Sequence, residues 1–296
     1  MGRDIRSYCI SKWSANKEDV RVKYFWENYY EFRRNLSEEM GLCVDRLLEE
    51  FNYYSQSVVN KDFVSLHWKL ISTYKIDIDY TVFAVLKSQK GTYNSSYEYI
   101  GEYKNLNKVS KNNVFPDISD CFGRVYWPLV KNVVFIDDFC GSGKTFIDYL
   151  LSILEFVKGK TIYYVVIHSM GEAEKRINHF AKDNNLKVNL VAEHMSNAAF
   201  SEIEDLQGKK ELFIEESKLL GIRDSEILGF SNSESLVAFH ENTPNNTLGV
   251  FMKDTEKNTA LFPRKIDSRP VFMEMKAKRE RKKTNNYVCR SRSRNG

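Results

Sequence analysis

The 296-residue sequence is poor in cysteine and contains no cysteine pair spaced for a metal or redox site. Its five cysteines are scattered, odd in number and never arranged as Cys-x-x-Cys, which argues against a disulfide framework and a zinc knuckle. The five histidines are also dispersed, without a His-Glu-x-x-His motif or paired-ligand spacing. We therefore expect no metal held by protein side chains alone, and a reducing, cytoplasmic compartment.

Long apolar runs are missing as well. No stretch approaches the roughly 20 apolar residues that a membrane-spanning helix needs, and no apolar segment flanked by positive charge stands at the N-terminus. Hydrophobic residues make up 42% of the sequence and charged residues 28%, which is ordinary for a globular protein. The sequence therefore predicts a protein without a membrane partner.

The net charge of +4 hides an asymmetry between the C-terminal end and the rest of the chain. Residues 264–296 contain twelve Lys and Arg against three Asp and Glu, so the remainder is mildly acidic. The low apolar content of residues 266–296 predicts a basic, flexible tail. Such a tail suits salt-dependent contact with nucleic acid phosphates, although it can equally be a solvated extension.

Residues 1–75 are expected to form a helical N-terminal cap or lid. From residue 17 onward, apolar and aromatic residues recur at steps of three and four, which is typical of amphipathic helices. Ser37, followed by Glu38 and Glu39, predicts a helix start. Asn60-Lys61-Asp62 is interpreted as a break before a further helix.

Residues 76–265 are expected to form an α/β domain with a mostly parallel sheet. Buried strands and amphipathic helices alternate there, and this order predicts parallel strands joined by right-handed crossovers. Residues 96–106 fit either a helix or a strand. The expected strands are residues 79–88, 131–138, 161–170 and 186–195, the expected helices are residues 141–159 and 171–185, and two short strands are expected at 235–239 and 248–252. His168, at the end of a buried strand, is expected to be a satisfied histidine at the edge of the core.

The segment VVFIDDFCGSGKT, residues 133–145, joins an apolar strand to a helix through two acids and a glycine-containing turn. Its last residues look like the phosphate loop of an ATPase, which requires Gly-x-x-x-x-Gly-Lys-[Ser/Thr]. The first glycine of that pattern would fall at Asp138, whose carboxylate would repel a polyphosphate. We therefore reject a nucleoside triphosphate loop.

The same segment suits a sugar phosphate. The strand delivers Asp137 and Asp138 to the carboxyl edge of a parallel sheet, where such sheets bind their ligands. A helix N-terminus follows, and its unpaired N–H groups and dipole favour an anion. We predict that the acids accept hydrogen bonds from vicinal ribose hydroxyls while the loop holds a 5′-phosphate. The alternative is an inert pair of acids satisfied by neighbouring N–H groups.

Apolar residues followed by Asp-Asp, two variable residues, a small pair, Gly, any residue and Thr form a motif that resembles the signature of type I phosphoribosyltransferases. The resemblance implies binding of phosphoribosyl pyrophosphate (PRPP) together with Mg²⁺, with Asp137 and Asp138 as catalytic residues. Purine-salvage relatives often carry an aspartate base at the position of Gly141, so purine salvage is disfavoured here. The implied phosphate-binding residues are Cys140, Gly141, Ser142, Gly143, Lys144 and Thr145.

A second resemblance lies near the C-terminus, in residues 242–247 (NTPNNT) and 261–264 (LFPR). These segments are similar to phosphoribosyltransferase-like proteins of bacterial conflict and antiphage systems, including effectors that accompany retron reverse transcriptases. The resemblance implies a toxic effector, with a reverse transcriptase and its DNA product as partners, and it is compatible with a homo-oligomer. His240, Asn242, Asn245 and Asn246 carry groups that suit contacts with a base or ribose, or else they form turns.

Two further segments have both a functional and a structural interpretation. Lys87 and Lys90 follow the first strand of the domain, where the family binds pyrophosphate, but loop lysines are usually solvated. Residues 107–120 fit a flexible loop that closes over the reacting centre, or a plain connection.

Two functions therefore stay open. The first is a phosphoribosyltransferase, or a related hydrolase of PRPP or nucleotides, that acts at the anomeric carbon. The second is a non-catalytic module that senses a nucleotide on the same fold.

Overall fold

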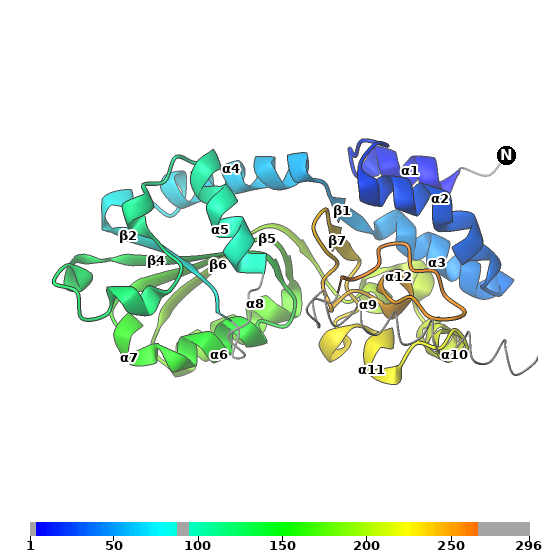
Figure 1. Cartoon of the computed structure of the whole chain (residues 1–296). Coiled ribbons are helices and arrows are strands. Elements are labelled where there is room, and N and C mark those ends of the chain that lie inside the picture. The colour runs from blue at the N-terminus through cyan, green and yellow to red at the C-terminus, as the bar shows by residue number, and fades with distance from the viewer. Residues whose placement is uncertain (1–3, 88–94, 266–296) are drawn as a thin grey trace, which may run out of the picture. The chain divides into compact units, whose positions relative to one another are not determined.

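The computed structural model describes residues 4–87 and 95–265, and residues up to Pro263 belong to one compact unit. A five-stranded parallel sheet with the order β3-β2-β4-β5-β6 organises half of this unit (Figure 1). This arrangement confirms the predicted α/β class. The strands are β2 (Thr81–Val85), β3 (Val114–Phe115), β4 (Asn132–Cys140), β5 (Thr161–Met170) and β6 (Lys187–Ser196).

Helices cover both faces of the sheet (Figure 1). Because successive side chains of a strand point to opposite faces, Val134 and Ile136 of β4 pack in one cluster while Val133 and Phe135 pack in another. The first cluster lies under α4 (Gln56–Ser72) and α5 (Ser95–Leu106), the second against α6 (Lys144–Ser152), α7 (Leu154–Val157) and α8 (Gly171–Asp183). The continuous apolar run in β4 is therefore explained by burial on both faces.

A second core joins the N-terminal helices to residues 199–262. Its centre is aromatic, with Phe51 and Phe262 stacked at 4.8 Å between ring centroids. β1 (Asn52–Tyr54) pairs in parallel with β7 (Val237–Phe239) beside this core. The helices are α1 (Ile5–Lys12), α2 (Val20–Arg34), α3 (Glu38–Glu50), α9 (Ala199–Glu202), α10 (Lys210–Leu219), α11 (Asp224–Ile227) and α12 (Gly249–Met252).

Short 3₁₀ helices occupy several of the connections. They are η1 (Ile78–Tyr80), η2 (Lys111–Asn113), η3 (Ile118–Cys121), η4 (Trp127–Leu129), η5 (Glu204–Leu206) and η6 (Phe230–Asn232). Residues 107–120 thus contain η2, β3 and most of η3, and β3 forms an edge of the sheet. Whether this segment closes over a ligand stays a prediction.

Local signals begin two of the N-terminal helices as polar caps should. The hydroxyl of Ser37 accepts a hydrogen bond from Met40 N at 3.1 Å, which confirms the predicted start of α3. Asp19 caps α2 by accepting from Arg21 N at 2.9 Å. The Arg21 guanidinium then donates to the Phe239 carbonyl at 2.8 Å and the Thr243 hydroxyl at 2.6 Å, which ties α2 to the segment after β7.

Two expectations within the N-terminal helical segment are wrong. Residues 52–54 form β1 instead of helix, because Asn52 N donates to Leu236 O at 2.8 Å and this partner is remote in sequence. Residues 60–62 do not break a helix but lie inside α4. Asp62 is tolerated there because its buried carboxylate lies 3.0 Å from Nε2 of His194.

Three further segments differ from or complete the predictions. Residues 248–252 do not form a strand, since residues 249–252 form the fully buried helix α12, and a short apolar run does not distinguish the two. The helix expected over residues 141–159 is divided at Ile153 into α6 and α7. Residues 96–106, which fitted either a helix or a strand, lie in α5.

The structure tests only part of the expectations for residues 1–75 and for the C-terminal tail. α4 belongs to the sheet's core, whereas α1 to α3 belong to the second core. Whether residues 1–75 act as a cap or lid stays a prediction, and the tail 266–296 lies outside the described residues. Within the described part of the chain, no helix combines the length and apolar character needed to cross a membrane.

Candidate functional site

The end of β4 and the start of α6 form one continuous loop at the carboxyl edge of the sheet. β4 continues through Cys140, residues 141–143 make the turn, and α6 begins at Lys144. Gly143 stands immediately before the helix with φ +71°, a conformation that favours glycine. The hydroxyl of Ser142 accepts from Lys144 N at 3.4 Å. All predicted phosphate-binding residues therefore lie on this turn and the adjoining ends of β4 and α6.

The two acids at the end of β4 lie in different environments, because neighbouring residues of a strand face opposite ways. Asp137 is only 7% exposed, and the Tyr164 hydroxyl donates to its Oδ2 at 3.2 Å. Its Oδ1 accepts from the backbone N–H of Asp138 at 3.0 Å. Asp138 is half-buried. The structure therefore offers Asp138 as the more accessible carboxylate and Asp137 as an acid held by the strand and Tyr164.

Ser96 fixes the strand next to the acids. Its hydroxyl accepts from Leu86 N at 2.8 Å, just after β2, and donates to Ile136 O in β4. The chain after β2 therefore leaves the sheet beside the acid pair. Lys87 follows at this point, forms an ion pair with Asp117 and is 42% exposed. Lys90, the second predicted pyrophosphate contact, lies outside the described residues.

The side chains around the turn differ in what they can offer a phosphate. Lys144 is 63% exposed, and its Nζ lies 2.8 Å from Asp148 one turn further along α6. Thr145 is exposed. Cys140 is buried, and burial raises the pKa of its thiol to about 12. Because a thiol rather than a thiolate is present at neutral pH, Cys140 contributes backbone groups and packing instead of a nucleophile.

The side chain of Asn246 lies next to Gly141 in the β4–α6 loop. A Cβ atom added at Gly141 would lie 2.3 Å from Nδ2 of Asn246, so any larger residue there would require the Asn246 side chain to move. The same Nδ2 donates to Phe230 O at 3.2 Å and to the Ser233 hydroxyl at 2.9 Å. Asn246 therefore holds η6 beside the β4–α6 loop. These hydrogen bonds give Asn246 a structural role, and its contact with a base or ribose stays a prediction.

Asn242 and Asn245 also form turn contacts. The side chain of Asn242 accepts from Thr243 N at 2.8 Å, and its carbonyl accepts from Phe239 N at 2.9 Å. The Asn245 carbonyl accepts from Phe230 N at 2.8 Å. These bonds are the structural role that Asn has in turns. Ligand contacts by either residue stay predictions.

A cavity of about 520 Å³ adjoins the outer side of the loop. Gly141 and Ser142 line it together with charged residues of α8 and polar residues of η6. Glu172, Lys175 and Arg176 of α8 interact with one another there, since Arg176 lies 3.3 Å and Lys175 4.0 Å from Glu172. The β4–α6 loop is therefore bordered by a polar cavity.

Tyr99 and His240 supply two buried polar atoms near Asp138. Tyr99 in α5 is 1% exposed, and among the described residues neither its hydroxyl nor Nε2 of His240 has a hydrogen-bond partner. The two ring centroids are 6.4 Å apart. Burial, together with the charge of Asp138, raises the pKa of Tyr99, and burial lowers the pKa of His240. A neutral phenol and a neutral imidazole therefore stand near the more accessible acid.

Neither Tyr99 nor Tyr164 was recognisable from the sequence as a neighbour of the acids. Tyr99 lies in the segment that fitted either a helix or a strand, and Tyr164 is one residue of an unbroken apolar strand. Their roles depend on which strand and helix lie next to β4. Unlike these two tyrosines, His240 carried a recognisable signal because it precedes the Asn-rich segment.

His168 is a satisfied core histidine, as predicted. It pairs with Phe139 across the β4–β5 ladder. Its Nδ1 lies 2.7 Å from the Tyr54 hydroxyl and its Nε2 lies 2.8 Å from the Ser196 hydroxyl. Burial lowers the pKa of His168 to about 3. The imidazole is therefore neutral throughout the physiological range and links β5 to β1 and β6.

This histidine predicts an acid-dependent loss of stability. Between pH 6.5 and pH 3, His168 is protonated in the unfolded state, where its pKa is near 6.5. It stays neutral in the folded state, where its pKa is about 3. The free energy of unfolding should therefore fall as pH drops from 6.5 towards 3, by about 2 kcal/mol between pH 7 and pH 5. Urea unfolding at both pH values should show a smaller loss in His168→Gln. The exposed His179→Gln should keep the wild-type loss, and an unchanged loss in His168→Gln would contradict the prediction.

Within the described part of the chain, no group of three or more His, Cys, Asp or Glu side chains is placed to hold a metal ion. The site instead offers one accessible carboxylate, Asp138, beside the turn of residues 141–143 and the N-terminus of α6. Mg²⁺ commonly binds in proteins through one or two carboxylates together with substrate phosphates. The residues present therefore fit Mg²⁺ that arrives with a phosphorylated ligand.

Comparisons with known proteins bear on this arrangement. One solved structure similar to this chain is the xanthine-guanine-hypoxanthine phosphoribosyltransferase of Helicobacter pylori, with 14% identity and a TM-score of 0.32 over 54% of this chain and 96% of that chain. A search of curated proteins finds no match. The family model described as PRTase-CE, where PRTase denotes phosphoribosyltransferase, matches residues 13–264. Because this match spans most of the sequence and includes the whole β4–α6 loop, the chain belongs to the PRTase-CE family of phosphoribosyltransferase-like proteins.

Proposed function

We propose that this protein binds PRPP or a phosphoribosyl nucleotide and acts at the anomeric carbon of the ribose. The observation that carries this proposal is the β4–α6 loop, which joins two acids to a glycine turn and a helix N-terminus within a few residues. Carboxylates accept hydrogen bonds from vicinal hydroxyls, and a helix N-terminus favours an anion. Both groups of a ribose 5-phosphate are therefore matched by one loop.

Each part of the loop has a separate task in this proposal. The backbone N–H groups of residues 141–145 receive the 5′-phosphate, with Gly143 shaping the turn. Asp138 accepts hydrogen bonds from the ribose hydroxyls. Asp137, which the Tyr164 hydroxyl holds from the interior, orients the strand end and adds negative charge. The nine-residue helix α6 supplies the positive end of its dipole.

The reaction at the anomeric carbon breaks its bond to the pyrophosphate oxygen, and the electron pair leaves with pyrophosphate. Positive charge then develops on the ribose, as in other glycosyl transfers, and the carboxylate of Asp138 stabilises it. A lone pair of the acceptor forms the new bond. The proton that the acceptor loses has a recipient in His240, whose Nδ1 lies 3.4 Å from the Glu241 carboxylate. A carboxylate only accepts, so this contact favours the tautomer with a lone pair on Nε2.

Mg²⁺ bound with PRPP would neutralise charge on the leaving pyrophosphate. Its ligands would be oxygens of PRPP, with Asp138 as the accessible protein carboxylate. The role as an antiphage effector, with a reverse transcriptase and its DNA as partners, rests on the sequence resemblance and stays a prediction. A homo-oligomer stays a prediction as well, and so does the cytoplasmic location, which rests on the scattered cysteines.

Calorimetry with PRPP and Mg²⁺, followed by an assay for released pyrophosphate, tests the proposal. We expect PRPP to bind with a dissociation constant below about 1 mM, the upper end of ordinary substrate affinities. Release of pyrophosphate with an acceptor or water would identify an enzyme. Binding without release, with a range of nucleobases and with water as acceptors, would favour the nucleotide-sensing module. No binding of PRPP or of nucleoside 5′-monophosphates would refute the proposal.

A further inference from the structure

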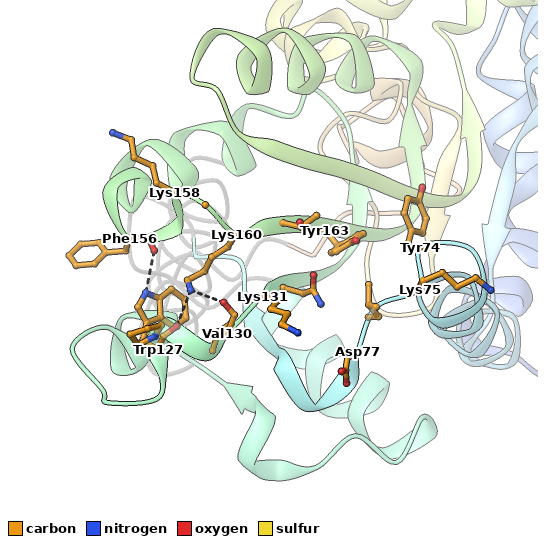
Figure 2. Close-up of a pocket in the computed structure, with 15 residues that line it drawn as sticks. Tyr74, Lys75, Asp77, Trp127, Val130, Lys131, Phe156, Lys158, Lys160 and Tyr163 are labelled. Atoms are coloured by element: carbon orange, nitrogen blue, oxygen red, sulfur yellow. Dashed lines mark hydrogen bonds between the residues drawn. The ribbon is translucent and has the colours of Figure 1, made fainter.

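A pocket of about 750 Å³ lies at the amino-terminal ends of β4 and β5 (Figure 2). Four segments line it, which are residues 74–77 after α4, η4 with the start of β4, the end of α7, and the start of β5. The acids lie towards the opposite end of the nine-residue β4, five and six residues after Asn132, which is about 17 to 20 Å at the usual rise of a strand. The pocket is therefore separate from the proposed ribose phosphate site.

The pocket is basic. Among the described residues, Lys75, Lys131, Lys158 and Lys160 line it, against the single carboxylate of Asp77. Lys158 is paired with Glu155 at 2.7 Å, and Asp77 accepts from Asp79 N at the start of η1. Lys75 and Lys131 are exposed, and neither forms an ion pair in the described part of the chain. The pocket therefore holds a net positive charge close to two exposed ammonium groups.

Lys160 is the most unusual member of this group. It is 8% exposed, and its Nζ donates to Val130 O at 2.8 Å and to Trp127 O at 2.9 Å (Figure 2). Its Nζ also lies 4.3 Å from the centre of the Trp127 ring. Among the described residues, no carboxylate lies within ion-pair distance of it. An ammonium has three N–H donors, so one donor and one uncompensated charge remain at the wall of the pocket.

A buried charge without a counter-charge is costly, and burial does lower the pKa of Lys160. Its two carbonyl bonds fix the position of the ammonium but add no negative charge. An anion in the pocket would supply the missing counter-charge. Lys75, a second lysine of the pocket, has a positive φ of +54°, a backbone conformation in which glycine is the favoured residue.

Aromatic side chains accompany the lysines. Phe156 is 50% exposed, and Trp127 and Tyr74 are half-buried at the pocket wall. Base rings stack on such surfaces, and stacking on an aromatic side chain stabilises bound nucleotides irrespective of the base. None of the described residues that line the pocket is an arginine, so they do not supply the planar fork that best matches carboxylates. Lysines with aromatic rings favour a nucleotide over an acidic peptide.

We propose that this pocket binds a nucleotide unit, with its phosphate on Lys75, Lys131 and Lys160 and its base against the aromatic wall. The unit can come from a free nucleotide or from single-stranded nucleic acid, since the two share this chemistry. Binding at the amino ends of the strands leaves the β4–α6 loop accessible. The proposal is therefore independent of the function proposed for that loop.

The test uses the full-length protein carrying Asp138→Asn, because AMP and ribose 5-phosphate are also ligands of the site proposed at the β4–α6 loop. The three probes are AMP, ribose 5-phosphate and fluorescein-labelled dT10, and the lysine variants are compared in this background. We expect AMP to bind about fivefold or more tightly than ribose 5-phosphate, because only AMP can stack. The double variant K75Q/K131Q should weaken binding of AMP and dT10 about tenfold. For dT10 it should also lower the slope of log affinity against log salt by about 1.4, since two phosphate contacts are lost.

The matched control is K23Q/K182Q, which removes two exposed lysines from α2 and α8. It should change neither affinity by more than about twofold. Without the lysine substitutions, binding of both AMP and dT10 would show that a free nucleotide is sufficient as a ligand. Binding of dT10 alone would show that the nucleotide unit comes from single-stranded nucleic acid. Both outcomes support the proposal. Equal affinity for AMP and ribose 5-phosphate without dT10 binding, or equal losses in the two double variants, would overturn it.

Binding of PRPP to K75Q/K131Q separates this proposal from the previous one. Neither lysine belongs to the β4–α6 loop, so calorimetry should give the wild-type value. If wild-type protein binds no PRPP, the AMP and dT10 measurements still test whether the lysine pocket binds a nucleotide. Melting temperatures of both double variants should stay near that of the wild type, because all four lysines are exposed.

Discussion

Replacing Asp138 with asparagine is expected to weaken PRPP binding about 100-fold. The amide keeps the shape of the carboxylate but removes the charge that accepts hydrogen bonds from ribose hydroxyls. A hydrogen bond to a charged group contributes about 1.5 to 3 kcal/mol, and Asp138 is proposed to accept more than one. Calorimetry with PRPP and Mg²⁺ measures the change directly.

The control for this substitution is Asp183→Asn, which removes an exposed carboxylate at the end of α8. It should bind PRPP as the wild type does. Because Asp138 is half-buried rather than part of the core, Asp138→Asn should change the melting temperature by only a few degrees. Wild-type affinity in Asp138→Asn would show that the acid is not a ribose contact.

Replacing Gly229 with alanine should give the largest loss of stability, about 2 to 5 kcal/mol. Gly229 has φ +73° and ψ 172°, a region that only glycine occupies readily. A Cβ atom there would lie 2.0 Å from the Asn246 carbonyl oxygen. The backbone conformation costs about 1 to 2 kcal/mol and the displaced packing about 1 to 3 kcal/mol more. Urea unfolding followed by circular dichroism would measure the difference.

Gly208→Ala separates backbone conformation from the steric clash. Gly208 also has a positive φ, +83°, but an added Cβ would meet no atom within 4 Å. We expect a loss of about 1 kcal/mol from this variant. Similar losses at the two positions would show that the contact between Gly229 and Asn246 does not determine the outcome. Because Asn246 backs Gly141, Gly229→Ala should also weaken PRPP binding.

The parallel strands and the β4–α6 loop were predictable because their signals are local. An apolar run such as residues 133–136 requires burial on both faces, which in a chain of alternating strands and helices means a parallel sheet. The turn depends on Gly143 and on the helix that follows it, both adjacent in sequence to the acids. Ser37 was predictable for the same reason, since a cap bonds only to its own helix.

Elements that depend on remote partners were not predictable in this way. β1 is a strand because β7, almost 200 residues later, offers a parallel edge. The apolar residues of α12 are equally compatible with a helix and with a strand. In the structure they form a helix that is buried in the second core. In both segments the deciding contacts lie far away along the chain.

That two acids, a glycine turn and a helix start lie together follows from the amino-acid order alone, because covalent neighbours cannot separate. How the two acids differ depends on the packing of the sheet, which places Asp137 against Tyr164 and Asp138 towards α5. It also brought Tyr99 near His240, and Lys75, Lys131 and Lys160 into one pocket. These groupings arise where strands end beside one another, and the order of strands in a sheet is set by packing rather than by position along the chain.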